Sequence, residues 1–369
     1  MNYRPKHLKL PPKGVLTKNE AKGISPYVFT DTMAIAIDVA LVTNRPLLVS
    51  GDPGCGKSRL ADAIAQLQGW SLLSRTITSR TRLEGLTAEV DQLRRLNDAQ
   101  AARLVTMQRA PAQVGWNKRS GSTNRPLNRP QGRAAQKSAE PPDGIYLNPG
   151  IFWWAFDPDS ARRRGLTLDE AQAHGVDLDY PGIRRQPPKG KPAGTLLLID
   201  EIDKAEPDLP NDLLEPLDRR RFDLPDGFRA HCDFGAGDGK QPAHACIQAP
   251  AAEKLQLLTL ITTNGERELP QAFLRRCVLL EIDDPDQDRL VDIASQHFPN
   301  GNQERIQAVA KLLVKLRQQA RDLNVRPPGT AELLDAVRAC EGLEVEISDA
   351  TDSVWSHITR AVLAKDPAL

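Results

Sequence analysis

The residues best suited to chemistry form one stretch of eight, Gly51-Asp52-Pro53-Gly54-Cys55-Gly56-Lys57-Ser58. Glycines at this spacing let backbone N–H groups point inward at a phosphate with no Cβ in the way. Lys57 reaches the β- and γ-phosphates of a nucleotide, and Ser58 offers its hydroxyl to Mg²⁺. The stretch therefore predicts a loop that binds ATP and Mg²⁺, and we expect all eight residues and the adjoining Arg59 to contact the nucleotide.

Such a loop needs a strand before it and a helix after it, because the helix N-terminus adds partial positive charge at the phosphate. The apolar run 46–50 predicts the strand, and residues 58–68 predict the helix. A further helix is expected over 31–42 and a second strand over 71–78. Strand, glycine-rich turn and helix together favour phosphate binding over a chance glycine turn.

Two acids follow another aliphatic run. Residues 195–199 predict a strand of a parallel sheet covered on both faces, and Asp200 and Glu201 come at its carboxyl end. Asp200 suits Mg²⁺, and Glu201 suits the base that polarises an attacking water. Asn264 ends a similar run over 255–264, where its amide can hold that water or touch the γ-phosphate. Solvated acids after a strand are common, and it is the upstream loop that favours the catalytic interpretation.

Two adjacent arginines, Arg275 and Arg276, stand at a helix end just before the predicted strand 278–282. In one subunit they would lie far from that subunit's own nucleotide. In a ring they could reach the γ-phosphate of a neighbouring subunit as arginine fingers. The alternative is a pair of surface arginines whose positive charges interact favourably with the negative end of a helix dipole.

The order of these parts resembles the AAA+ ATPases over residues 24–341, and within them the MoxR branch. The phrases that carry the resemblance are Arg45-Pro-Leu-Leu-Val-Ser-Gly, Leu198-Ile-Asp-Glu-Ile-Asp-Lys-Ala, Pro210-Asn-Asp-Leu-Leu-Glu-Pro-Leu-Asp218, Leu269-Pro-Gln-Ala-Phe-Leu-Arg-Arg-Cys277 and Pro328-Gly-Thr-Ala-Glu-Leu-Leu334. Thr78-Ser-Arg-Thr and Trp154-Ala-Phe-Asp157 are similar to MoxR-like members encoded beside von Willebrand factor A proteins in bacterial conflict systems.

The resemblance implies roles for particular residues. The eight-residue loop matches Walker A, Asp200 and Glu201 match Walker B, and Asn264 matches sensor 1. Arg276 before a cysteine resembles the clamp-loader Ser-Arg-Cys finger and is preferred to Arg275. The usual sensor 2 arginine is missing from the first turn of the lid helix, and Arg326 just upstream is the candidate to replace it.

The resemblance also implies the fold class: an α/β P-loop NTPase core of the AAA+ type, with a parallel sheet flanked by helices and a C-terminal α-helical lid domain. We divide the chain into an N-terminal arm over 1–23, an ATPase domain over 24–286 and the lid over 287–369. The ATPase domain carries an inserted segment over 88–194. Amphipathic patterns predict the C-terminal helices at 287–297, 302–323, 330–341 and 349–364.

The expected activity is ATP hydrolysis between subunits of a homo-oligomeric ring, with six as the expected number, which remodels or activates a protein client. The resemblance implies a von Willebrand factor A protein as that client. One alternative is a nucleic-acid-associated motor like McrB, and another is a regulatory nucleotide switch. Glu201 argues against a pure switch, because a switch without turnover tolerates loss of the base.

Part of the insertion is unusually basic. Between residues 99 and 139 there is no Asp or Glu, and eight Lys or Arg residues are interspersed with Gly, Ser, Asn and Pro. This composition predicts a mobile, solvated segment and favours it over a nucleic-acid contact, because Trp116 alone could stack on a base there.

Composition narrows the remaining possibilities. The net charge is +1, the five cysteines are scattered, and no apolar run approaches the roughly 20 residues that span a bilayer. We therefore expect a cytoplasmic protein without a membrane segment. The side chains of His231, Cys232, His244 and Cys246 have the right types for zinc, but their spacing is no familiar finger and a metal-free hairpin is favoured.

Overall fold

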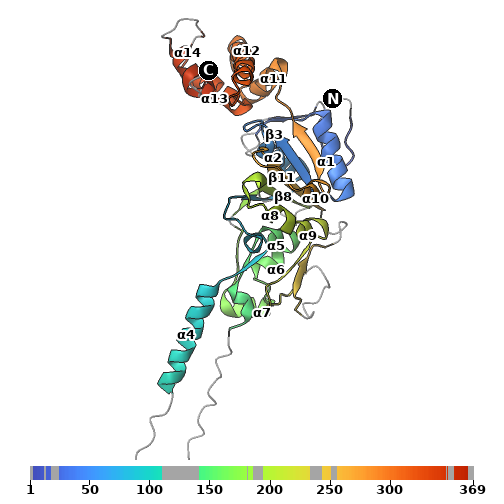
Figure 1. Ribbon diagram of the computed structural model, residues 1–369, viewed down its shortest axis with the longest axis vertical. Coiled ribbons are helices and arrows are strands. Elements are labelled where there is room, and N and C mark those ends of the chain that lie inside the picture. The colour runs from blue at the N-terminus through green and yellow to red at the C-terminus, as the bar shows by residue number, and fades with distance from the viewer. Residues whose placement is uncertain are drawn as a thin grey trace, which may run out of the picture.

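The computed structural model describes residues 3–11, 14–17, 25–109, 141–180, 182–185, 194–232, 243–250, 256–345, 347 and 353–364. The predicted basic segment is described only as far as residue 109, and the hairpin tip at 233–242 lies outside the described residues. Figure 1 shows a sheet with its covering helices in the middle, the C-terminal helices at one end, and a long helix projecting from the other.

The centre of the molecule is a six-stranded sheet of mixed direction. In spatial order its strands are β12 (Val278–Ile282), β3 (Leu47–Gly51), β11 (Gln256–Thr263), β8 (Gly194–Asp200), β4 (Ser71–Thr76) and β7 (Ile183–Arg185). The five strands predicted from the sequence run parallel, whereas the edge strand β7 is antiparallel to β4. The predicted parallel sheet is thus present over five strands, and β7 adds one antiparallel strand at its edge.

The aliphatic strands are buried on both faces, as their unbroken apolar runs predict. Successive side chains of a strand point to opposite faces. In β8, Leu196 and Leu198 join the core beneath α1 (Asp31–Thr43) and α2 (Lys57–Gln68), while Leu197 and Ile199 join the core on the other face. Two hydrophobic layers therefore fix the register of the sheet.

The chain order of the strands differs from their spatial order in one place that matters. β11 lies between β3 and β8 and pairs in parallel with both. The carboxyl ends of all three strands meet at one edge. The loop after β3, the acids after β8 and the polar end of β11 are therefore neighbours, although they come from distant parts of the chain.

The N-terminal segment is docked on the domain. Asp38 of α1 accepts hydrogen bonds from the backbone N–H groups of Lys6, His7 and Leu8, at 2.6, 3.1 and 2.9 Å, and from the Tyr3 hydroxyl at 2.9 Å. A short ladder between β1 (Val15–Leu16) and β2 (Tyr27–Val28) continues this contact. The described part of the predicted arm is thus packed against the face of the sheet that α1 and α2 cover.

The polar stretch over 83–104, whose composition favours a helix, forms three elements instead of one. They are α3 (Leu83–Leu86), β5 (Ala88–Val90) and α4 (Gln92–Arg109), and β5 pairs with β6 (Leu147–Pro149). The break has a local cause, because Asp91 accepts a hydrogen bond from the Arg94 N–H at 2.9 Å and so begins a new helix. α4 projects away from the body in Figure 1.

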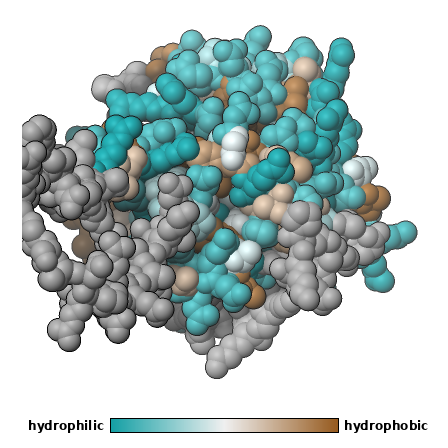
Figure 2. Space-filling model, turned by 90° about the horizontal axis from the view of Figure 1, so that it is seen from below, coloured by the Kyte–Doolittle hydropathy of each residue, from teal (hydrophilic) through white to brown (hydrophobic). Residues whose placement is uncertain are grey.

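The rest of the insertion is a compact unit built on aromatic residues. It holds a 3₁₀ turn over Asp143–Tyr146, then α5 (Ile151–Phe156), α6 (Pro158–Arg162) and α7 (Leu168–His174). Every residue of α5 is buried, and its rings pack on one another and on Phe222. The aromatic run therefore serves as the core of this unit. Figure 2 views the molecule from the end that carries this unit. The surface of the described residues there is mainly hydrophilic.

Between β8 and β11 lie a 3₁₀ turn over Ile202–Lys204, α8 (Leu209–Asp212), α9 (Leu214–Asp218) and an antiparallel hairpin. The hairpin pairs β9 (Arg221–Asp223) with β10 (Cys246–Gln248) and is extended by a bridge from Ala230 to His244. The hairpin predicted between the acids and Asn264 is thus present in its described part.

The C-terminal part is helical and has a core of its own. After α10 (Gln271–Leu274) and β12 come α11 (Gln287–His297), α12 (Gln303–Asp322), α13 (Thr330–Gly342) and α14 (Val354–Ile358), followed by a π-helical turn over Thr359–Leu363. Leucine, valine and alanine side chains of these helices form a hydrophobic cluster separate from the two sheet cores. The helices predicted at 287–297, 302–323 and 330–341 are confirmed within one residue.

The Asp38 contact predicts an acid-sensitive contribution to stability. Burial alone would raise the pKa of this carboxyl, but the N–H groups of Lys6 and Leu8, the Tyr3 hydroxyl and His7 together hold the pKa below its ordinary value. A depressed folded-state pKa stabilises the fold above the unfolded pKa, and this contribution disappears as the pH falls through the folded value. We expect Asp38→Ala to lower the free energy of unfolding by about 1–3 kcal/mol at pH 7.

Urea unfolding at pH 7 and at a series of pH values below 4 measures both effects. The exposed Asp292 provides the matched control, and Asp292→Ala should leave the midpoint unchanged. A loss in Asp38→Ala that stays the same size at the lowest pH would contradict the titration argument.

Candidate functional site

The loop after β3 has the backbone that its glycines permit. Gly56 caps the N-terminus of α2 at φ 101°, a conformation that a residue with a Cβ adopts only under strain. At Gly51 the constraint is space, since a Cβ there would lie 2.6 Å from the carbonyl oxygen of Ile282. The loop can therefore turn between β3 and α2 only with these residue types, as the sequence predicted.

Lys57 is folded back into this loop. Its Nζ donates to the carbonyl oxygens of Gly51 at 2.7 Å and Asp52 at 3.0 Å, and the residue is only 7% exposed. Within the described part of the chain no carboxylate pairs with this ammonium group. A buried cation held by neutral carbonyls beside backbone N–H groups is suited to a bound anion.

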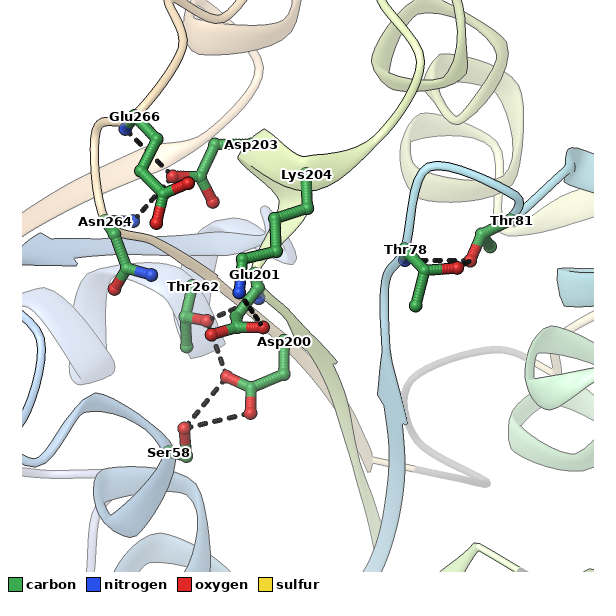
Figure 3. A network of polar contacts seen from close by, with 10 residues as sticks. All are labelled: Ser58, Thr78, Thr81, Asp200, Glu201, Asp203, Lys204, Thr262, Asn264 and Glu266. Atoms are coloured by element: carbon green, nitrogen blue, oxygen red, sulfur yellow. Dashed lines mark hydrogen bonds and ion pairs between the residues drawn. The ribbon is translucent and has the colours of Figure 1, made fainter.

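Ser58, Asp200 and Thr262 form one hydrogen-bonded cluster across three elements (Figure 3). The Ser58 Oγ donates to the Asp200 carboxylate, with oxygens at 2.8 and 3.0 Å, and the Thr262 Oγ1 donates to Asp200 Oδ1 at 2.6 Å. Hydroxyl and carboxylate oxygens are the donor set that Mg²⁺ prefers. The predicted metal ligands Ser58 and Asp200 are thus brought together.

Glu201 sits in a left-handed conformation, at φ 61° and ψ 52°. Its N–H donates to Thr262 Oγ1 at 2.9 Å, and its carboxylate pairs with Lys204 Nζ at 2.8 Å. In a continued strand Glu201 would point to the face opposite Asp200, and the positive φ breaks that alternation. Figure 3 shows both carboxylates around Thr262. The Glu201 hydrogen bond raises the pKa of the exposed Lys204, which therefore stays charged.

Asn264 follows β11 and is fixed through its backbone. Asp203 Oδ2 accepts the N–H groups of Asn264 and Glu266, both at 3.0 Å, while Asp203 itself is 2% exposed. The turn is tightened by Gly265, whose N–H donates to Thr263 Oγ1 at 3.0 Å. The predicted sensor position thus lies at the same edge of the sheet as the acids (Figure 3).

A cavity of about 510 Å³ adjoins the loop on the side of the C-terminal helices. Its lining includes loop residues 54–56 and Arg59, together with residues of β2, α11 and α13. This volume is in the range of small-molecule sites. Lys57, Ser58 and Asp200 are not among the lining residues. The cavity therefore adjoins the phosphate-binding loop and not the acid cluster.

Several cavity residues escaped the sequence analysis. Tyr27 of β2 lines the cavity, and burial raises the pKa of its phenol, so that the group stays protonated. Arg289 of α11 and Arg338 of α13 line it as well. Each comes from a segment with no motif of its own, so only the folded arrangement identifies them. Arg59, which the sequence predicts to contact a nucleotide, also lines the cavity.

Arg326, the candidate for sensor 2, is not among the cavity residues. Its side chain is 64% exposed, and it lies 3.9 Å from Glu332. Glu332 in turn accepts the Gly329 N–H at 3.1 Å and comes within 3.4 Å of the position of a Cβ on Gly54. An acid, and not an arginine, therefore approaches the loop from the first turn of α13.

Arg275 and Arg276 lie at the opposite edge of the sheet from the loop. Val278 pairs with Leu47 at the start of β3, so four residue steps, or roughly 13 Å of strand, separate this edge from Gly51. Arg276 forms an ion pair with Asp218 and donates to the carbonyl of Ala272, and Arg45 caps the carbonyls of both arginines. Neither arginine can reach the loop 51–58 of the same chain.

The four residues weighed as zinc ligands are only partly gathered. His244 lies on the hairpin bridge, and the Cys232 thiol lies 4.0 Å from the carbonyl oxygen of Cys246. Among the described residues, no three His, Cys, Asp or Glu side chains are grouped closely enough to hold a metal ion. Nor does any described helix combine the length and apolarity that crossing a bilayer requires.

No protein-family model matches the chain. A stretch of 53 residues is 45% identical to Midasin of Giardia intestinalis, a distant AAA+ protein, and covers 14% of this chain and 1% of that relative. The chain thus spans a very small part of the relative it matches. The five-strand parallel sheet flanked by helices and this short similarity fit an AAA+ ATPase in general.

The Asp203 contact predicts a local effect on amide exchange. Asp203→Ala removes the acceptor of two N–H groups, so the amide protons of Asn264 and Glu266 should exchange about tenfold faster. Asp203→Asn retains an oxygen acceptor and should preserve much of the protection. The amide of Gly265, which donates to Thr263, is the internal control. Equal acceleration at all three amides would indicate general loosening and contradict a specific anchor.

Proposed function

We propose that the protein is an AAA+ ATPase of the MoxR-like branch that hydrolyses ATP between subunits of a ring. One observation carries the proposal: a lysine without a carboxylate partner, a serine–aspartate pair and a second carboxylate converge at the carboxyl edge of one parallel sheet. That combination serves phosphate binding, metal binding and water activation together. These groups come from two segments far apart in the chain, the start of α2 and the end of β8, so their meeting is not a by-product of one local sequence.

The residues would divide the work as follows. Lys57 and the loop N–H groups hold the phosphates, and Ser58 and Asp200 would hold Mg²⁺. The metal, when bound, neutralises charge on the phosphates and orients them. Glu201 orients the attacking water and accepts its proton at the carboxylate, which requires its ion pair with Lys204 to open or to share the group. Asn264 positions the same water or the γ-phosphate.

The cavity beside the loop would take the base and sugar of ATP. Its walls come from β2 on one side and from α11 and α13 on the other, so a nucleotide would bridge the α/β domain and the C-terminal helices. These helices would act as the lid, and Arg289 and Arg338 are better placed than Arg326 to contact the ligand from it. Nucleotide turnover would then move the lid relative to the sheet.

Arg276 would complete the site of a neighbouring copy. The position of this arginine at the far edge of the sheet excludes a role at its own loop, and a homo-oligomeric ring, of six subunits by the family resemblance, gives it a phosphate to meet. The client would be a protein, with a von Willebrand factor A protein as the first candidate. Support for this client comes from the sequence phrases at 78–81 and 154–157 alone.

Replacing the proposed base separates binding from turnover. Glu201→Gln should keep ATP affinity within a few fold and reduce steady-state hydrolysis by about 100-fold or more, because the water loses its proton acceptor. The matched variant Lys57→Ala should instead weaken ATP binding by about tenfold or more, since charge-assisted hydrogen bonds to the phosphates are lost. Near-normal hydrolysis by Glu201→Gln would remove Glu201 from the reaction.

Mixing subunits tests the arginine across the interface. Arg276→Ala should bind ATP normally and lose about 10³-fold in hydrolysis. Adding Glu201→Gln subunits, which supply Arg276 but no base, should restore turnover at the shared interfaces. Asp218→Ala removes the same ion pair but keeps the arginine, so it should retain hydrolysis. Mixed assemblies that form but stay inactive would contradict the proposal, and a defect in Arg275→Ala alone would transfer the role to Arg275.

A further inference from the structure

Thr262 is a buried polar residue at the second-to-last position of β11. It is 1% exposed, and its neighbours Leu260 and Ile261 in β11 are fully buried aliphatic residues. A hydroxyl in such a place costs free energy unless it is hydrogen-bonded, and valine would fill the same volume without that cost. The position therefore carries a hydroxyl for a reason other than packing.

The Thr262 hydroxyl both donates and accepts a hydrogen bond. It donates to Asp200 Oδ1 at 2.6 Å and accepts the N–H of Glu201 at 2.9 Å. One oxygen thus joins the carboxylate proposed to hold the metal and the backbone of the residue proposed as base (Figure 3). β11 pairs directly with β8, and this pairing places the Thr262 side chain beside the two acids.

The hydrogen bond that Thr262 accepts comes from the strained backbone of Glu201. A residue with a Cβ in the left-handed region costs about 1 kcal/mol, and here the conformation also turns the Glu201 N–H toward β11. The donor half acts on the carboxylate, since Asp200 Oδ1 receives the Thr262 proton while both carboxylate oxygens face Ser58. The hydroxyl therefore fixes the rotation of the Asp200 carboxylate. It also fixes the position of the Glu201 backbone, from which the second carboxylate extends.

We propose that Thr262 is a positioning residue for the hydrolytic site, and that its hydroxyl sets the mutual placement of Asp200 and Glu201. The inference rests on the proposed ATPase function and deepens it. Neither the loop motif nor the acid pair predicts this residue, because it comes two positions before the expected end of its strand. Loss of the hydroxyl should disturb metal binding and water activation together, while ATP binding through Lys57 continues.

The experiment compares Thr262→Val, which keeps the shape, with Thr262→Ser, which keeps the hydroxyl. Hydrolysis is measured against ATP concentration and, separately, against Mg²⁺ concentration, and ATP affinity is measured directly. For Thr262→Val we expect kcat to fall by about 10–100-fold, the Mg²⁺ concentration for half-maximal rate to rise by about tenfold, and ATP affinity to stay within about threefold. Thr262→Ser should return all three quantities to within about threefold of the unmodified chain.

The matched control is Thr195→Val, at a buried threonine near the far end of β8, which should leave all three quantities unchanged. Unaltered kcat and Mg²⁺ dependence in Thr262→Val would overturn the inference, as would a serine variant as defective as the valine variant. Should Thr262→Val fold poorly, the serine variant with circular dichroism still decides, since a required hydroxyl predicts near-normal hydrolysis. An unmodified chain that neither binds nor hydrolyses ATP would instead reject the proposed function, and this inference with it.

Discussion

The constraint on which the site depends is the placement of β11 between β3 and β8. Neighbouring strands lie about 4.8 Å apart, so an interposed strand separates the phosphate loop from the acids by roughly two such steps. Ser58 at the start of α2 closes that distance from one side, since its hydroxyl lies 2.8 Å from Asp200. Thr262 closes the distance from β11, since its hydroxyl lies 2.6 Å from Asp200 Oδ1. The geometry of the acids is therefore set by sheet order and two hydroxyls, and not by the acid motif alone.

A second set of contacts sets where the C-terminal helices meet this edge. Arg317 of α12 is 4% exposed and donates to the carbonyl oxygens of Pro328 at 2.8 Å and Pro285 at 3.0 Å. It also lies 3.4 Å from Asp284, just after β12. Burial lowers the pKa of this arginine, an effect opposed by Asp284. One guanidinium thus ties the exit of the sheet to the entry of α13, and α13 is the helix whose first turn approaches the phosphate loop.

Elements defined by strong local patterns could be predicted from the sequence. β12 begins and ends where its apolar run predicts, and α11 where its amphipathic period predicts. At the start of α11, Asp286 supplies an N-cap by accepting the Arg289 N–H at 2.9 Å. The phosphate loop and the acid pair carry motifs that specify their own context. The antiparallel edge strand β7 could not be predicted, because three residues amid a proline-rich stretch give no periodic signal. Asp203 and Thr262 were missed for another reason: their partners are some 60 positions away, and only strand order brings them together.

The docking of the N-terminal segment has a practical consequence. Three of the four donors that reach Asp38 are backbone N–H groups, which every residue except proline possesses. The contact with Asp38 therefore does not depend on the side chains of Lys6 and His7, both of which are exposed. These two positions can therefore carry a fluorophore or a cross-linker without a change in the contact. A label there would report from the face of the sheet that α1 and α2 cover, on a segment anchored to α1.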